Sequence, residues 1–101
     1  MRKYIKDLIP QYLDGDKARG SSPLRYSEYY GRKITAMSYE GDNLYSYDTL
    51  IGKLDAENYI LYLTDARYSA TTTRQLNDTA QIALNCGYKV IMCNSEDLKN
   101  L

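Results

Sequence analysis

The 101-residue chain contains no histidine, and this absence excludes the most familiar catalytic and metal-binding arrangements. Serine and cysteine nucleophiles usually take their activating base from a histidine, so the common forms of those catalytic sets are missing. Zinc sites that include histidine are missing too, and the two cysteines cannot supply a four-ligand structural zinc site by themselves. The sequence therefore predicts neither a hydrolase of these types nor a metal centre.

Glycine-rich phosphate loops are also absent, because neither GxxxxGKS/T nor GxGxxG occurs in the chain. The carboxylates are scattered, and most of them lie at apparent turns, where Asp forms local hydrogen bonds with the backbone. A small metal-dependent nuclease would need an acidic pair, and no spacing in the sequence indicates one. We therefore expect no catalytic residues, no cofactor and no enzyme activity.

Cysteine and long apolar runs are scarce as well. Cys86 and Cys93 are the only cysteines and do not make a disulfide framework, so we expect buried thiols in a reducing compartment. No apolar run is long enough for a signal peptide or a membrane span. These observations favour a cytoplasmic protein without a membrane partner.

Charge of one sign is not in excess, since 13 Lys and Arg residues balance 13 Asp and Glu residues. A dedicated binder of duplex DNA usually carries a strong basic excess, and a protein that imitates DNA would carry an acidic one. Neither global signature is present, which leaves local charged patches as the electrostatic feature to look for.

Among aromatic residues the chain has twelve tyrosines, with no phenylalanine and no tryptophan. Tyrosine combines a large apolar ring with a hydroxyl that needs a partner, so it suits half-buried positions and contact surfaces. Two interpretations stay open at this point. The tyrosines replace phenylalanine in a small core, or they form an interface.

The first third of the chain predicts a helix followed by a loop. Apolar residues recur at helical spacing from Tyr4 to Leu13, and Asp14-Gly15 closes the segment. Pro10 indicates either a kinked helix or two short turns. Residues 16–32 are rich in Gly, Ser and charge, which predicts a surface loop with a short helical turn at its tyrosine cluster, Tyr26, Tyr29 and Tyr30.

The remaining residues predict strands and one long helix. Segments 33–40, 43–55 and 58–64 have hairpin patterning, and Gly52 indicates a bulge or a close approach of two backbones. Residues 71–85 predict a helix with Leu76, Ala83 and Leu84 on its buried face and Gly87 after its end. Residues 88–93 predict a strand, and 94–100 a frayed helical tail.

We therefore expect an α+β fold in which a small, mainly antiparallel sheet, a hairpin or meander, has one helix packed on a face and an N-terminal helix. The whole chain, residues 1–101, is expected to form a single domain. It divides into an N-terminal helical segment and loop, 1–32, and a ββ(β)αβ core, 33–101.

Three consecutive threonines, Thr71 to Thr73, precede the long helix. Thr72 and Gln75 fit the capping box, in which the two residues satisfy each other's free amides, and Thr71 could cap with a shift of one residue. The same geometry suits anion binding. A helix start with free amides and hydroxyls, close to Arg67 and Arg74, can hold a phosphate or carboxylate.

Leu44 to Asn77 resembles a family of small uncharacterised proteins of phages and plasmids of Gram-positive bacteria. That family shows Ser-Tyr-x-Thr before a strand and Tyr-Ser-x-Thr-Thr-Ser/Thr-Arg/Lys, followed by a histidine, after a hairpin. Gln75 replaces the histidine, which argues against histidine-dependent chemistry here. The matching positions are Ser46, Tyr47, Thr49, Tyr68, Ser69, Thr71, Thr72, Thr73 and Arg74.

The resemblance implies a mobile-element protein that acts in the cytoplasm of a host cell by binding. Our first hypothesis is an inhibitor of a bacterial defence component, an anti-CRISPR protein that contacts a CRISPR effector nuclease. The alternative is a nucleic-acid-binding accessory protein that uses the helix start at 69–74. A homodimer stays open in both cases. The candidate partner-binding residues are Tyr47, Tyr62, Arg67, Tyr68, Ser69, Thr71, Thr72, Thr73 and Arg74.

Overall fold

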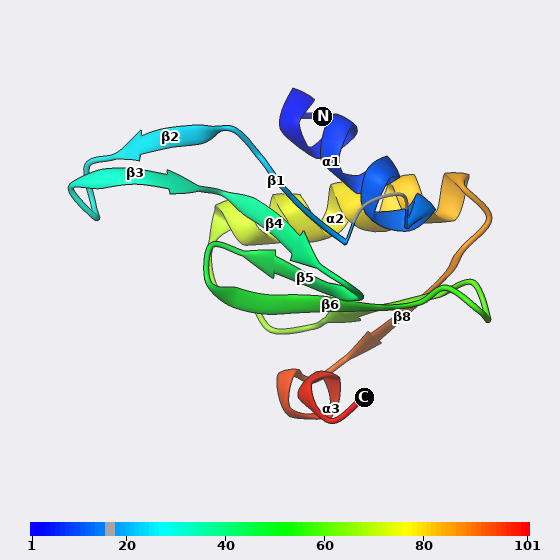
Figure 1. Ribbon diagram of the computed structural model, residues 1–101. Coiled ribbons are helices and arrows are strands. Elements are labelled where there is room, and N and C mark those ends of the chain that lie inside the picture. Colours follow the sequence, from blue (N-terminus) through cyan, green and yellow to red (C-terminus); the bar gives the residue numbers. More distant parts are fainter. Residues whose placement is uncertain (16–17) are drawn as a thin grey trace.

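The computed structural model describes residues 1–15 and 18–101 and contains one six-stranded sheet, one two-stranded sheet and three helices (Figure 1). The elements in chain order are α1 (Lys3–Asp14), β1 (Arg19–Ser21), β2 (Leu24–Ser27), β3 (Arg32–Thr35), β4 (Met37–Glu40), β5 (Asn43–Ser46), β6 (Thr49–Asp55), β7 (Ile60–Thr64), α2 (Ala70–Asn85), β8 (Lys89–Cys93) and α3 (Ser95–Lys99).

The larger sheet has the strand order β1-β4-β5-β6-β7-β8. Every neighbouring pair from β1 to β7 is antiparallel, and only β7 and β8 are parallel, because α2 carries the chain back between them. The predicted α+β class, the mainly antiparallel sheet, the packed helix and the N-terminal helix are confirmed. None of the helices in the described part of the chain is long and apolar enough to cross a membrane.

Helix α1 runs without interruption through Pro10, which settles the choice between one helix and two turns. Its apolar residues fall on one face and are buried. Gly15 ends the helix in the left-handed conformation, with φ 69°, and its N–H donates to the carbonyl of Gln11 at 3.2 Å. The buried residues of this helix are Ile5, Leu8, Ile9, Tyr12 and Leu13.

The prediction of a loop over residues 16–32 is wrong for the part that the structure describes. Asp16 and Lys17 lie outside the described residues. From residue 18 on, the segment forms β1, which pairs with β4, and β2, which pairs with β3. We call β2–β3, Leu24–Thr35, the arm. Tyr26 lies in β2 rather than in a helical turn. Tyr29 and Tyr30 lie in the connecting turn, which the N–H of Gly31 closes by donating to the carbonyl of Ser27 at 2.8 Å, a single turn of helical type. Strands of three or four residues are too short to show a period, and the partner of β1, strand β4, is distant in sequence.

The arm extends beyond the end of the larger sheet (Figure 1). Its two strands pair only with each other. The single strand expected over residues 33–40 is therefore divided at Ala36, where the chain leaves the arm and enters the sheet. This division places the base of the arm beside the starts of α1 and α2.

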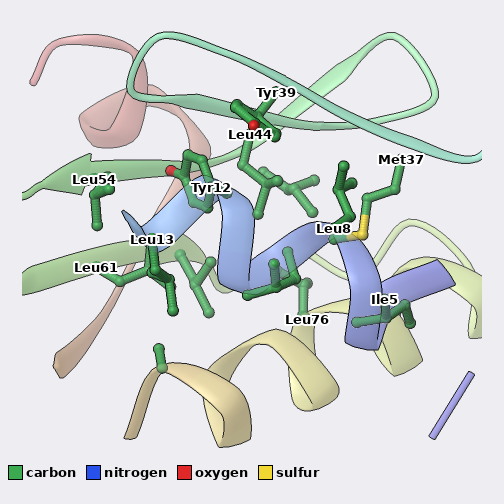
Figure 2. Packing of buried hydrophobic residues seen from close by; sticks show 14 residues of the cluster. Ile5, Leu8, Tyr12, Leu13, Met37, Tyr39, Leu44, Leu54, Leu61 and Leu76 are labelled. Atoms are coloured by element: carbon green, nitrogen blue, oxygen red, sulfur yellow. The ribbon is translucent and has the colours of Figure 1, made fainter. Parts of the chain in front are cut away.

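The hydrophobic core lies between the sheet and helices α1 and α2 (Figure 2). Two tyrosines take the place that phenylalanine would have: the rings of Tyr12 and Tyr39 lie 5.3 Å apart between centroids. The Tyr12 hydroxyl donates to the carbonyl of Asp42 at 2.7 Å. Burial raises the pKa of Tyr12, because the charged phenolate would be desolvated. Part of the tyrosine excess is thus core, while the arm carries exposed tyrosines.

Gly52 lies both next to a bulge and at a close approach of two backbones, the two features that a glycine inside a strand indicated. The β5–β6 register shifts next to it, which leaves Ile51 without a partner as a bulge. A Cβ at Gly52 would lie 3.0 Å from Cδ2 of Leu63 and 3.3 Å from the carbonyl oxygen of Tyr62. The close approach of β6 to its neighbours therefore leaves little room for a side chain at this position.

The C-terminal elements match the expected order, with three corrections. Leu84, expected on the buried face of α2, is 59% exposed, and Cys86, expected to be buried, is exposed. Helix α3 is not frayed, because the Asn94 side chain accepts from the N–H of Asp97 and Leu98 is fully buried. Residues on the sheet face opposite the core contact α3: the Thr64 hydroxyl lies 2.9 Å from that of Ser95.

Candidate anion-binding site

The start of α2 is fixed by Ser69 rather than by a threonine. Ser69 is extended, with φ −159°, and its Oγ accepts from the N–H of Thr72 at 3.1 Å. The capping box of Thr72 and Gln75 is therefore wrong, and so is the cap at Thr71. The helix begins at Ala70, so Thr72 is already the third helical residue, whose amide is the one that a serine cap satisfies.

Behind this cap, four side chains form a directed series of hydrogen bonds. The Ser69 hydroxyl donates to Oγ1 of Thr72 at 3.2 Å, and the Ser46 hydroxyl donates to Oε1 of Gln75. Because each hydroxyl carries one hydrogen, the 3.1 Å contact between Ser46 and Thr72 has Thr72 as donor. The order Ser69, Thr72, Ser46, Gln75 leaves no donor of the series unused. Ser46, Thr72 and Gln75 are buried, whereas Ser69 is exposed, and we call the four residues together the buried relay.

Gln75 completes the relay by joining two more parts of the chain. It is fully buried, and its amide nitrogen donates to the hydroxyl of Tyr4 at 3.0 Å and to the carbonyl of Ala36 at 3.1 Å. Both of its hydrogens and its oxygen are therefore satisfied. Gln75, which replaces the histidine of the resembled family, therefore links α2 by hydrogen bonds to α1, to β5 and to the junction of the arm with the sheet.

Outside the relay, a hollow of about 450 Å³ opens between the arm, the start of α1 and the start of α2. We call it the arginine hollow, because Arg2, Arg25 and Arg74 come to it from three separate elements or their flanks. No Asp or Glu is among its lining residues. These are Arg2, Tyr4, Arg25, Tyr26, Ser27, Ile34, Ala36, Tyr47, Ala70, Thr71 and Arg74.

The three guanidinium groups are not neutralised by carboxylates. Within residues 1–15 and 18–101, the only ion pair within 4.0 Å joins Lys3 and Asp7, on the exposed face of α1. Asp78 lies one turn beyond Arg74 and lines an adjoining hollow together with all three arginines, yet it forms no ion pair with any of them within 4.0 Å. The arginine hollow is therefore a local concentration of positive charge in a chain of zero net charge.

The helix start adds to this charge. Ala70 and Thr71, the first two residues of α2, line the hollow, and the first amides of a helix have no partner within the helix. The helix dipole places partial positive charge at the same end. The exposed Thr71 adds a hydroxyl donor. The chemistry that fits these groups is the binding of a phosphate or carboxylate.

Tyr47 brings an aromatic residue to the same hollow through an unusual backbone. It lies in the two-residue turn between β5 and β6, with φ 54°, and its N–H donates to the carbonyl of Ala36 at 3.0 Å. A left-handed conformation costs free energy for a residue with a side chain. Tyr59, in the turn between β6 and β7, has a similar φ of 56°, so this strain is not confined to the hollow.

The candidates proposed from the sequence divide into separate places. Tyr47, Thr71 and Arg74 line the arginine hollow. Ser69 and Thr72 belong to the buried relay, and Thr72 is buried, so its hydroxyl serves the framework rather than the surface.

The other four candidates lie elsewhere. The Tyr68 hydroxyl is 2.9 Å from the hydroxyl of Ser95, which directs that ring towards α3. Tyr62 lines a different hollow, on the α3 side of the sheet. Arg67 is exposed outside the arginine hollow, and Thr73 is half-buried on α2.

Sequence reasoning missed Arg2, Tyr4, Arg25 and Tyr26 as parts of one site. The tyrosine cluster was a signal, but nothing local indicated that the segment around Arg25 returns to the start of α2. Among the described residues, no group of three Cys, Asp or Glu side chains could hold a metal ion.

A comparison with known protein families covers the arm, the buried relay and most of α2, but not Arg2 and Tyr4 of the arginine hollow. No curated protein matches the chain, and no solved structure matches it. Residues 22–91, which exclude α1 and β1, match the pattern of a family described as "Family of unknown function (DUF8033)". Since this match covers more than half of the chain, the protein belongs to that family.

Proposed function

We propose that this protein is a binding protein, not an enzyme, and that the arginine hollow binds the phosphate groups of a nucleic acid. The observation that carries the proposal is the composition of the hollow. Three arginines and no carboxylate line it, although acidic and basic residues are equal in number over the chain. Such a concentration of one charge costs free energy in the unliganded protein, and a bound anion relieves it.

Phosphate fits this site better than an isolated carboxylate does. Arginine presents a planar fork of donors that matches phosphate oxygens, and three forks can contact successive groups along a backbone. Hydroxyls and helix-start amides are frequent phosphate partners in nucleic-acid complexes. The arm extends the basic surface, since Arg25, Arg32 and Lys33 outnumber its one acidic residue, Glu28.

The test is binding of a labelled 12-nucleotide strand, followed by fluorescence anisotropy at increasing salt. We expect affinity to fall as salt rises. Arg74→Ala should weaken binding by about tenfold or more, the cost of a lost charge-assisted hydrogen bond. Arg67→Ala is the matched control, because it removes the same charge seven residues away and outside the hollow. No binding at low salt, or an equal loss in both variants, contradicts the proposal.

A second function is favoured by the tip of the arm. Its turn exposes Tyr29 (89% exposed) and Tyr30, whose rings meet edge to face at 5.0 Å, and Leu24 is exposed at its base. Exposed tyrosines give a large contact area at a low cost in side-chain entropy, and tyrosine is enriched in protein–protein interfaces for this reason. The corresponding proposal is a phage or mobile-element protein that inhibits a defence component in the host cytoplasm, an anti-CRISPR inhibitor of a CRISPR effector nuclease.

This second function has its own experiment. Purified effector nuclease is assayed for DNA cleavage with wild-type protein and with Tyr29→Ala. Inhibition that the substitution weakens supports protein contact through the arm. If excess wild-type protein leaves DNA cleavage unchanged, this second function is contradicted. The nucleic-acid proposal does not depend on that result.

A further inference from the structure

Resting on the proposed function, we infer that the arginine hollow takes one unpaired nucleotide, so that the ligand is single-stranded nucleic acid rather than a duplex. The proposal concerns the shape and lining of the site in addition to its charge. A flat basic surface would suit the phosphate backbone on the outside of a DNA or RNA duplex. A hollow with tyrosines in its wall suits a base that has left its stack.

The size of the hollow agrees with a ligand of this class. Its volume of about 450 Å³ lies within the range of roughly 300–1,000 Å³ that is typical of sites for small molecules. In a duplex the bases are paired and stacked, and only the backbone is available to such a hollow. An unpaired nucleotide can place its base inside while its phosphates remain at the rim.

The lining supplies partners for both halves of a nucleotide. Arg74 and the start of α2 at Thr71 form the polar side, where a phosphate would receive guanidinium and amide donors. Tyr26 and Tyr47 line the same hollow, from the arm and from the β5–β6 turn. Tyr26 is 65% exposed, so its ring is available to a base. Stacking on tyrosine accepts any base, which predicts weak sequence preference.

The number of arginines sets the expected salt dependence. Three phosphate contacts to a single strand predict that log K falls with log salt with a slope of about −2. Loss of Arg74 should reduce the slope to about −1.4, since roughly 0.7 is contributed by each phosphate.

The experiment compares three 12-nucleotide probes by anisotropy with the full chain: a single strand of mixed sequence, the same sequence as a blunt duplex, and an abasic strand with the same number of phosphates. We expect the single strand to bind at least tenfold more tightly than the other two. Tyr26→Ala should weaken binding of the single strand about fivefold or more and leave the abasic strand unaffected. Tyr26→Phe should retain the wild-type affinity.

Because Tyr26 and Arg74 are both exposed, these variants are expected to fold, and a thermal melt checks this. Equal binding of single strand, duplex and abasic strand would overturn the inference while preserving the proposed function, because phosphate alone would then be recognised. Absence of salt-dependent binding to all three probes would overturn both. Binding only to an acidic peptide would have the same consequence.

Discussion

Ser46→Ala is the substitution that tests the buried relay most sharply. Ser46 is only 2% exposed, and its hydroxyl lies between Thr72, from which it accepts, and Gln75, to which it donates. The change removes a single oxygen and leaves no large cavity. Its cost therefore comes from polar groups that lose their partners, namely Oε1 of Gln75 and the hydroxyl hydrogen of Thr72.

The magnitude follows from these two groups. Each buried polar group without a partner costs about 1–3 kcal/mol, so we expect the two groups together to lower the free energy of unfolding by about 2–6 kcal/mol. The total for a domain of this length is about 5–15 kcal/mol. With about 4–8 °C of melting temperature per kcal/mol at this size, the melting point should fall by roughly 8 °C or more.

The assay is urea unfolding followed by circular dichroism, with a thermal melt as a second probe. Ser21→Ala is the matched control, because Ser21 is exposed on β1 and should change stability by less than about 0.5 kcal/mol. A double-mutant cycle with Thr72→Val should give a coupling of at least about 0.5 kcal/mol. A Ser46→Ala cost below that value, or strictly additive effects, would refute the relay as a stabilising unit.

Three further predictions concern the cap, the core and the sheet. Ser69→Ala should lower the free energy of unfolding by about 1 kcal/mol or more, because the helix loses its cap and the buried relay loses its first donor. Ser69→Asp keeps an acceptor at the cap and should lower it less. Equal losses of the two variants in urea unfolding would argue against the cap. Tyr12 has a raised pKa in the folded state, so its contribution is intact below pH 10 and declines by up to about 1.4 kcal/mol per pH unit above it. Tyr12→Phe should lose about 1 kcal/mol at pH 7 yet decline less steeply above pH 10, and identical alkaline slopes would contradict this. Gly52→Ala should lower the free energy of unfolding by about 1–3 kcal/mol, because the new Cβ lies 3.0 Å from Cδ2 of Leu63. Gly41→Ala, at an open turn, adds no such contact and should cost only the strain of its positive φ. Equal losses of the two variants would contradict overpacking at Gly52.

Most of the fold can be read from the sequence where a period is long enough to see. The buried positions of α1 recur at helical spacing from Ile5 to Leu13, those of α2 recur from Thr72 to Ala83, and β5 alternates between more and less buried residues. The strands before residue 36 are three or four residues long; β1 pairs with the distant β4, whereas β2 and β3 form a local hairpin. No local pattern distinguishes such strands from a polar loop.

The candidate site was only partly predictable for the same reason. The sequence pointed to the start of α2, and Thr71 and Arg74 do line the hollow there. Thr72 and Gln75 have the spacing of a capping box, but the helix begins at Ala70, so Ser69 is the cap and accepts from the N–H of Thr72. Arg2 and Arg25 join Arg74 only through tertiary structure, so no spacing in the sequence could reveal the charge of the hollow.

The most direct test of the central claim is a two-dimensional NMR titration with a trinucleotide. If a phosphate binds at the start of α2, the backbone amides of Ala70 and Thr71 and the side-chain N–H of Arg74 should shift together and saturably. The amides of β8, at the far edge of the sheet, should stay in place. Shifts confined to the tip of the arm, or none at low salt, would contradict the assignment of the arginine hollow as the binding site.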